Sequence, residues 1–259
     1  MKQFNQKFYL LVLILTILGF LCLILGFAFG GSATAYIDAS GIHFGKYENK
    51  PYEQEIKIES LEKIDADLSM TEVKILKSDE NKVVMSGANE KLKPQVEVVD
   101  GVLHINTSKK KNFHIGIFGA VADKEATITI YIKDDLKELK LENSYTDMKI
   151  KDINAKSLQL ESSFSEVNFS GTFEELDISN DFGEVTRNVK GNMTSKIEND
   201  FGDIKITYDQ ALENYNLKCE SDFGDIKING QNWKDVLNRI AGNGNIKIEN
   251  DFGDVELLF

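Results

Sequence analysis

The feature that most constrains the fold of this chain is a six-residue repeat. Its best copies begin at Asn180, Asn199, Ser221 and Asn250, and looser copies surround Tyr145 and Phe164. The second copy reads Asn199-Asp200-Phe201-Gly202-Asp203-Ile204, and successive aromatic residues lie 19, 18, 19, 22 and 29 residues apart. A period near 19 residues is typical of stacked-repeat proteins, in which no repeat buries its apolar face alone. The repeat therefore predicts an architecture rather than a reaction.

One copy shows how a rung of such a stack would form. Ser195-Lys196-Ile197-Glu198 predicts a short strand, Asn199 to Gly202 a turn, and Asp203-Ile204-Lys205-Ile206 a second strand. The two isoleucines of the second strand point one way and the lysine the other, as in a strand that is half exposed to water. Two strands and two turns per rung of ~19 residues predict an all-β, β-helix-like solenoid over residues 56–259.

The aromatic residues and glycines of the repeat are interpreted as structural. Glycine supplies a turn conformation that a residue with a Cβ disfavours. We expect the rings to stack inside the solenoid, and an exposed platform for sugar rings is the alternative. The positions concerned are Phe182, Phe201, Phe223, Phe252, Gly183, Gly202, Gly224 and Gly253.

Stacking would also align the acidic residues of the turns. Carboxylates repeated about every 5 Å repel one another unless they accept hydrogen bonds from turn amides or share cations. Calcium is the cation that prefers oxygen ligands. We expect the carboxylates to cap turn amides, and no cofactor is predicted. The alternative is a cation ladder formed by Asp200, Asp203, Asp222, Asp225, Asp251 and Asp254.

Two segments interrupt the β pattern. Between Phe223 and Phe252, the apolar residues Trp233, Val236, Leu237 and Ile240 follow a helical spacing, which predicts a helical insertion near residues 232–240. The glycine-broken stretch from Phe113 to Val121 predicts a loop. The last strand ends at Phe259, and because an uncovered edge is a template for pairing, we expect another part of the chain or a partner subunit to cover it.

The N-terminus predicts a membrane anchor. Residues 8–29 contain no charged side chain, and a helix of this length, about 33 Å, spans a hydrocarbon core of about 30 Å. Lys2 and Lys7 precede it, so the positive-inside rule places residues 1–7 in the cytoplasm and the rest outside, with residues 30–55 as a stalk. A signal peptide cleaved after Ala35 is the alternative. The apolar run is longer than the roughly 7–15 residues usual in signal peptides, which favours an uncleaved anchor.

Charge and composition exclude several functions. The net charge of −12 argues against nucleic acid and against electrostatic docking onto anionic lipid. Cys22 falls in the apolar run and Cys219 in a core position, so no disulfide framework is predicted. Asp-Phe-Gly also occurs in protein kinases, but neither a glycine-rich phosphate loop nor a catalytic-loop signature accompanies it. His43, His104 and His114 show no metal-ligand spacing, and we predict that the chain is not an enzyme.

The order of these motifs resembles the toastrack domain, catalogued as a candidate adhesin domain of bacterial envelope proteins. The resemblance rests on the strand Leu68 to Ile75, the Asp100-Gly101 hairpin, the strand Thr127 to Ile132 and the repeated rungs, and it covers about residues 56–259. It implies a β-solenoid ectodomain, often tied to envelope-stress signalling in Gram-positive bacteria, and no catalytic residues.

Together, these observations predict a single-pass protein of the cell membrane whose extracellular solenoid acts by binding, as a sensor or scaffold in cell-envelope homeostasis. The alternative is a surface adhesin or glycan-binding module. The expected partners are the lipid bilayer, through residues 8–29, and another envelope protein or a second copy of the chain.

Overall fold

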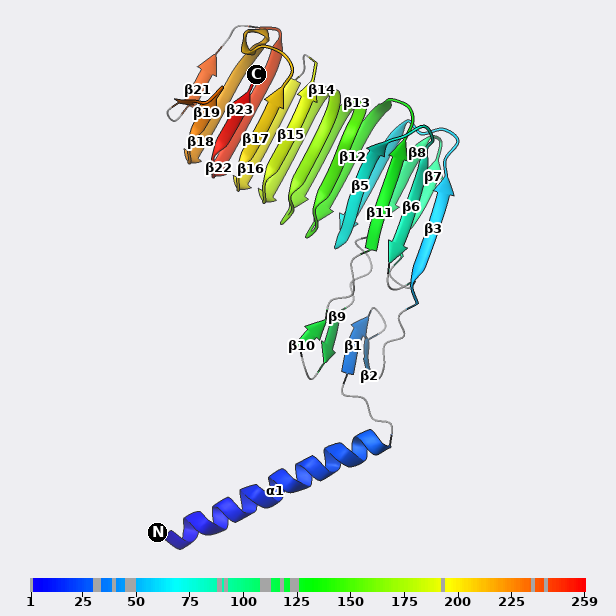
Figure 1. Ribbon diagram of the computed structural model, residues 1–259, viewed down its shortest axis with the longest axis vertical. Helices are drawn as coiled ribbons and strands as arrows, with labels where there is room; N and C mark the ends of the chain where they lie inside the picture. The colour runs from blue at the N-terminus through cyan, green and yellow to red at the C-terminus, as the bar shows by residue number, and fades with distance from the viewer. Residues whose placement is uncertain are drawn as a thin grey trace. The chain divides into compact units, whose positions relative to one another are not determined.

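The computed structural model describes residues 2–29, 34–38, 41–44, 50–87, 90, 93–107, 113–116, 119–121, 126–191, 194–233, 236–239 and 242–259. The chain forms two compact units, one of residues 1–49 and 110–123 and one of residues 50–109 and 124–259. Figure 1 shows the elements of both units, and each unit is described by itself below.

The first unit contains a long helix and a small sheet. Helix α1 (Lys2–Ala28) includes Phe8–Gly26, a stretch with a mean hydropathy of 3.0, of which no part is buried among the described residues. Among the described residues, this is the one helix long and apolar enough to cross a membrane. The four antiparallel strands of the sheet, in spatial order, are β10 (Gly119–Val121), β9 (Phe113–Gly116), β1 (Thr34–Asp38) and β2 (Gly41–Phe44).

This small sheet corrects two expectations. Residues 30–55 are not a featureless stalk, because β1 and β2 lie within them, and the described part of the stretch from Phe113 to Val121 is a strand pair rather than a loop. The reason is long-range pairing, since β9 pairs with β1 across a large gap in the sequence. The local strand propensity of either segment does not indicate which segment it pairs with. Residues 52–55 belong to strand β3 of the second unit, and residues 30–33, 39–40 and 45–49 lie outside the described part of the chain.

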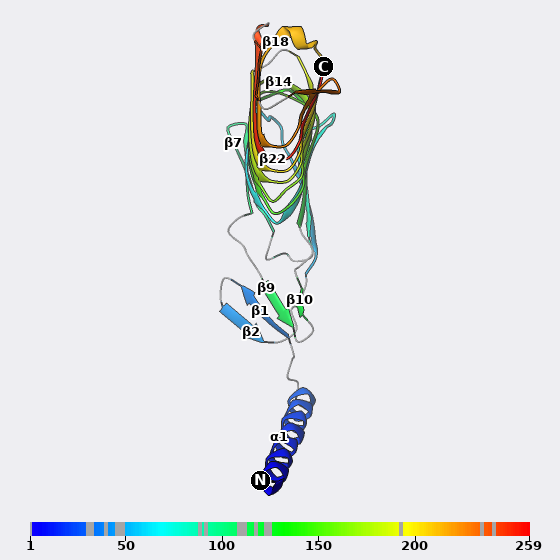
Figure 2. The same cartoon turned by 90° about the vertical axis from the view of Figure 1, so that its left-hand side faces the viewer.

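The second unit is a β-solenoid formed by one continuous 19-stranded sheet. The sheet is wound into two facing walls, and Figure 2 shows the rungs lying over one another. In stack order, the first wall contains β7 (Gln95–Val99), β8 (Val102–Asn106), β4 (Lys63–Ser69), β12 (Leu136–Ser144), the second halves of β13 (Met148–Ser163) and β14 (Val167–Phe182), β16 (Thr194–Phe201), β22 (Gly244–Phe252), β18 (Tyr215–Phe223) and β21 (Val236–Arg239).

The second wall follows the same order of rungs. It contains β3 (Tyr52–Lys57), β6 (Lys82–Gly87), β11 (Ala126–Ile132), β5 (Thr71–Lys77), the first halves of β13 and β14, β15 (Val185–Lys190), β17 (Ile204–Tyr208), β23 (Val255–Leu258), β19 (Ile226–Ile228) and β20 (Gln231–Trp233). A short 3-10 turn, η2 (Leu212–Asn214), precedes β18. The solenoid thus begins at Tyr52, slightly before the expected residue 56.

The core lies between the walls and repeats with the rungs. In β17, Ile204 and Ile206 are fully buried and Lys205 is exposed, as the period-2 pattern predicts. Parallel pairing in register places equivalent residues over one another, for example Ile197 over Ile248. Cys219 pairs with Ile248 and is fully buried, and burial raises the pKa of its thiol to about 12. The fold class predicted from the repeat is confirmed.

The order of the rungs in space differs from their order in the chain. The last rung, β22 and β23, lies between the rung of β16 and β17 and the rung of β18 and β19. Strand β23 therefore pairs on both sides, with β17 and β19. The expectation that the last strand is covered is confirmed, and the cover is an earlier segment of the same chain.

The expected helical insertion near residues 232–240 is wrong in its described part. Residues 231–233 form β20, which pairs antiparallel with β19, and residues 236–239 form β21, which pairs antiparallel with β18. The two strands cover the open edges of the terminal rung, whose backbone groups would otherwise lack partners. This long-range pairing outweighs the helical spacing of four apolar side chains. Ile240 lies outside the described residues.

An arginine occupies one core position that the repeat reserves for apolar residues. Arg187 pairs in register with Phe169 and Ile206 and is almost fully buried, which lowers the pKa of its guanidinium group. Its Nη1 donates a hydrogen bond to Ser195 Oγ at 3.2 Å, and the guanidinium lies 5.4 Å and 5.1 Å from the ring centroids of Phe169 and Tyr208. Aromatic faces thus replace water around this cation.

Candidate functional site

The aromatic residues of the repeat form one continuous stack along the edge of the solenoid where the two walls meet. From rung to rung, the ring centroids lie 4.7–5.2 Å apart and the ring planes deviate from parallel by 1–7°. In stack order, the residues are Tyr145, Phe164, Phe182, Phe201, Phe252 and Phe223, and we call this set the aromatic ridge.

The aromatic ridge is exposed, which corrects the expectation that the rings stack inside the solenoid. Phe201 is 41% exposed and Phe223, in the terminal rung, 66% exposed. The cause is that strand alternation ends at the turn: Ile178 and Asn180 face inward, but Asp181 and Phe182 are both exposed, so the last core-facing place before the turn goes to asparagine. The exposure of Phe182 could have been predicted from the sequence, because the inward residues on either side of the turn are Asn180 and Val185, and Phe182 lies between them.

The aromatic ridge does not match the sugar platform that was the alternative. The rings lie face to face, so each inner ring has its two faces covered by neighbours and presents only its edge to solvent. Sugar rings pack onto aromatic faces, whereas ring edges carry the positive part of the aromatic quadrupole. Met70 extends this apolar line by one rung, because Ser69 pairs in register with Ser144 and Met70 is also exposed. Sequence analysis missed Met70, which has no aromatic ring.

The turns are tight because adjacent rungs approach closely at the glycine. A Cβ on Gly202 would lie 2.2 Å from the carbonyl oxygen of Gly183, and the φ angle of Gly202 is +133°. On the other side, Gly202 N donates to the carbonyl oxygen of Phe252 at 2.8 Å. The backbone of Gly202 therefore contacts both neighbouring rungs. In the rungs without this glycine, Tyr145 and Phe164 themselves adopt positive φ angles of 66° and 57°.

A buried asparagine ladder lies behind the aromatic ridge. Asn199 Nδ2 donates to the carbonyl oxygen of Gly202 at 2.8 Å and to Asn250 Oδ1 at 2.9 Å. Asn180 Nδ2 in turn donates to Asn199 Oδ1 at 2.7 Å. Each side chain therefore closes its own turn and bonds to the next rung. Since Asn180, Asn199 and Asn250 are at most 2% exposed, these bonds are made away from competing water.

One acidic column follows the aromatic ridge in each turn and caps backbone amides. Asp203 Oδ1 accepts a hydrogen bond from the backbone N of Asp254, and Asp254 Oδ1 accepts one from the backbone N of Asp225, both at 2.9 Å. Asp147 Oδ1 does the same for the backbone N of Glu166. This geometry is the amide capping expected from turn chemistry.

A second acidic column precedes the aromatic ridge in each turn and consists of Asp181, Asp200, Asp251 and Asp222. Burial, followed by the charges of Asp251 and Asp181, raises the pKa of Asp200. Within the described part of the chain, no group of three or more His, Cys, Asp or Glu side chains is placed to hold a metal ion. The two columns therefore run beside the aromatic ridge as separate lines of carboxylates.

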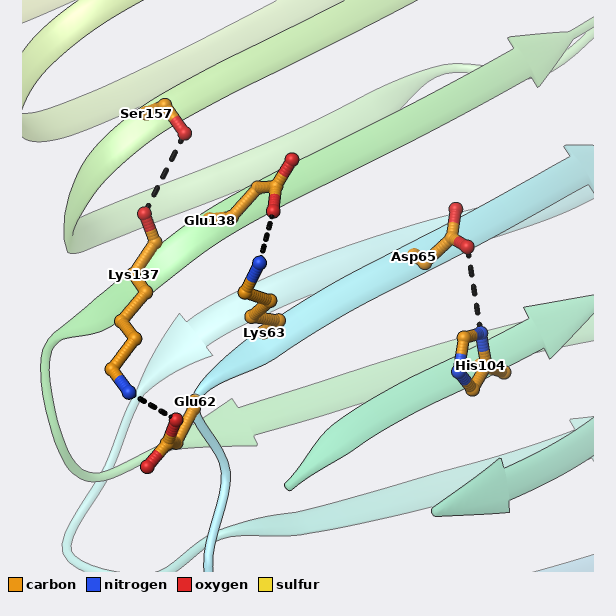
Figure 3. A network of polar contacts seen from close by, with 7 residues as sticks. All are labelled: Glu62, Lys63, Asp65, His104, Lys137, Glu138 and Ser157. Atoms are coloured by element: carbon orange, nitrogen blue, oxygen red, sulfur yellow. Dashed lines mark hydrogen bonds and ion pairs between the residues drawn. The ribbon is translucent and has the colours of Figure 1, made fainter. Parts of the chain in front are cut away.

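A second candidate lies on the outer face of the first wall, at the β7 end of the stack. A shallow hollow of about 630 Å³ is lined by Asp65, Asp67, Gln95, Val96, Glu97, His104, Ile105 and Asn106. Figure 3 shows His104 pointing toward Asp65, and Nδ1 and Oδ2 of the two lie 3.4 Å apart. Nearby, Lys63 pairs with Glu138 at 2.7 Å and Lys137 with Glu62. The side chains of His43 and His114 are outside the described residues, so His104 is the histidine whose surroundings the structure describes.

The family described as Toastrack DUF4097 matches residues 61–258, which confirms the resemblance. A candidate cell adhesion protein from Clostridium sporogenes is 17% identical, with 81% of this chain and 99% of that chain covered and a TM-score of 0.49. A candidate adhesin from Bacteroides fragilis is 14% identical, with coverages of 81% and 98% and a TM-score of 0.40. The comparison with curated proteins gave no match.

Proposed function

We propose, from the premise that the chain belongs to the Toastrack DUF4097 family, that it is a single-pass membrane protein whose solenoid lies outside the cell and acts by binding. It works as a sensor or scaffold in cell-envelope homeostasis, with another envelope component as its partner. Residues 8–29 hold it in the bilayer.

The observation that carries the binding function is the exposed aromatic ridge. Six stacked rings and Met70 form an unbroken apolar line on the surface of the second unit. Large contiguous apolar surface in a soluble domain marks an interaction site. The asparagine ladder and the close glycine contacts make this line rigid, so a partner would bind it with little ordering cost.

The position of the anchor supports the proposed topology. The apolar stretch Phe8–Gly26 follows Lys2 and Lys7, and the acidic solenoid follows it in the chain. Positive residues remain on the cytoplasmic side of such a helix. The glycan-binding alternative has less support, because sugar recognition needs open aromatic faces and the inner rings of the ridge have none.

Topology is tested by labelling single cysteines with a membrane-impermeant maleimide. We expect Lys205→Cys, on the outer face of β17, to react in intact cells, and Gln3→Cys to react only after permeabilisation. The native thiols give little background, because Cys219 is buried and Cys22 lies in the apolar helix. The opposite pattern would refute the topology, and loss of the Gln3→Cys label from the mature protein would show cleavage.

The binding role is tested by complementation. In a deletion strain challenged with a cell-wall antibiotic, the pair Phe201→Asn and Phe252→Asn should fail to restore survival. The control pair Lys205→Asn and Glu256→Asn, which removes an exposed ion pair on the second wall, should restore it. Equal rescue by both displayed variants would contradict a binding role for the aromatic ridge.

A further inference from the structure

We propose that the aromatic ridge and its two acidic columns form a docking surface for a cationic amphipathic helix, with an apolar stripe on the ridge and basic side chains on both flanks. This inference rests on the proposed binding function and adds the chemistry of the partner. Its test below uses purified protein, so it can fail while the topology and the complementation result stand.

The first argument is the distribution of uncompensated charge. On the first wall, carboxylates are neutralised by lysines two residues earlier in the same strand: Lys196 pairs with Glu198 at 2.8 Å, and Lys247 with Glu249 at 2.7 Å. Among the described residues, no such ion pair reaches Asp181, Asp200, Asp251 or Asp222 beside the aromatic ridge. In the other column, Asp254 lies 3.7 Å from Lys227. The column that precedes the aromatic ridge is therefore, within the described part of the chain, a line of carboxylates without ion pairs directly beside exposed apolar rings.

The second argument is that the column carries like charges at close range. Asp200 lies between the registered positions of Asp181 and Asp251, on strands that are one rung apart, or about 4.8 Å. Both neighbours act on Asp200 in the direction that disfavours its charged form. Basic side chains placed along the column would relieve this repulsion and would bind more strongly than at an isolated carboxylate.

The third argument is the period of the ridge. Its rings recur every 4.7–5.2 Å, close to the pitch of an α-helix, 5.4 Å. A helix that lies along the ridge would therefore present about one apolar turn to each ring, whereas a strand repeats on one face about every 6.8 Å. The five steps of the ridge span about 24 Å, which corresponds to a helix of about 16 residues.

Charge decides against the other occupants. A second copy that docked ridge to ridge would bring two pairs of acidic columns together, and like charges across an interface cost binding energy. Nucleic acid and anionic lipid are repelled for the same reason. A helix with basic flanks is the occupant that complements both the apolar line and the carboxylates on either side of it.

The test uses the full chain in nanodiscs of zwitterionic lipid. The probe is a fluorescent 16-residue peptide of leucine and lysine with helical periodicity, and its control is a permuted peptide of the same composition that cannot form an apolar stripe. Binding to empty nanodiscs is subtracted. Short chitin oligosaccharides and vesicles of anionic lipid serve as probes for the other occupants.

Two sets of charge variants distinguish an effect of the local surface on binding from an effect of net charge. The ridge set is Asp181→Asn, Asp200→Asn and Asp251→Asn. The control set, on the first wall, is Glu174→Gln, Glu175→Gln and Asp177→Asn, which changes the net charge equally at exposed positions away from the turn. Asparagine suits turns as well as aspartate does, and thermal unfolding of both sets checks that they remain folded.

We expect the amphipathic peptide to bind the wild-type chain, and the ridge set to weaken binding by about tenfold or more while the control set changes it by less than about twofold. Affinity should fall as salt rises. The proposal is overturned if the two sets weaken binding equally, if the permuted peptide binds as tightly, if no peptide binds, or if oligosaccharide or anionic vesicles bind the ridge more tightly.

Discussion

Phe201 and Phe252 stack with their ring centroids 4.8 Å apart and their planes 1° from parallel, although the complete rung that contains Phe223 separates them along the chain. The asparagines behind them are bonded in the same order, Asn199 to Asn250 at 2.9 Å. The last strands of the chain therefore lie between two rungs that precede them in the sequence.

The order of the rungs is tested by engineered disulfides. Lys205 and Glu256 are registered neighbours on β17 and β23, so the pair Lys205→Cys and Glu256→Cys should form a disulfide under mild oxidation. Lys205 and Lys227 lie on strands two steps apart, about 10 Å, so the pair Lys205→Cys and Lys227→Cys should not. A mobility shift on a non-reducing gel reads out both. Crosslinking of the second pair alone would show that the rungs follow chain order.

Gly202→Ala should destabilise the solenoid by about 3 kcal/mol or more, because its Cβ would lie 2.2 Å from a backbone oxygen of the adjacent rung. Gly230→Ala is the matched control: Gly230 also has a positive φ angle, +75°, but a Cβ there meets nothing within 4 Å. It should cost about 1 kcal/mol, from backbone conformation alone. Urea unfolding measures both. Equal losses would mean that close approach between rungs does not matter.

Asn199→Ala should cost about 2–3 kcal/mol in urea unfolding. The change removes the donor to Gly202 and Asn250, and it removes one of the two acceptors of the buried Asn180 amide, which keeps its bond to Gly183. Asn168→Ala, at an exposed position on β14, should change stability by less than about 0.5 kcal/mol. If the two variants were equally stable, the ladder would contribute nothing beyond its turn propensity.

The buried thiol of Cys219 should make the protein less stable at alkaline pH. Its pKa rises from 9.0 in the ordinary state to about 12 in the fold, so the unfolded chain loses this proton first as the pH rises. Stability from this group is complete below pH 9 and is lost between pH 9 and 12, at about 1 kcal/mol by pH 10. Urea unfolding at pH 8 and pH 10 should therefore show a smaller loss for Cys219→Val than for the wild type. Identical losses would contradict the assignment.

The repeat was sufficient to predict the rungs from Leu136 to Ile228, because each copy carries its own inward and outward pattern and its own turn. It could not predict their order, since Asn180, Asn199 and Asn250 offer the same ladder contact to any neighbour. The strands β20 and β21 were missed for a related reason: an open edge, not local propensity, determines their structure.

The sequence predicted the aromatic residues of the candidate site but not that they lie on the surface. The six aromatic positions followed from the period, and their exposure follows from the inward side chain of Asn180, which takes the last core place before the turn. Met70 and the hollow around Asp65 and His104 depend on the pairing of β4 with β12 and β8, which no local pattern in the sequence shows.

Hydroxyl-radical footprinting of the full chain in nanodiscs tests the central claim, that the stacked rings form an exposed surface, most directly. We predict that Phe201 and Phe252, each about two-fifths exposed, are oxidised several-fold faster than Phe169 and Phe173, which lie in the core. Protection of Phe201 and Phe252 equal to that of Phe169 would place the stack inside the solenoid and would contradict the account.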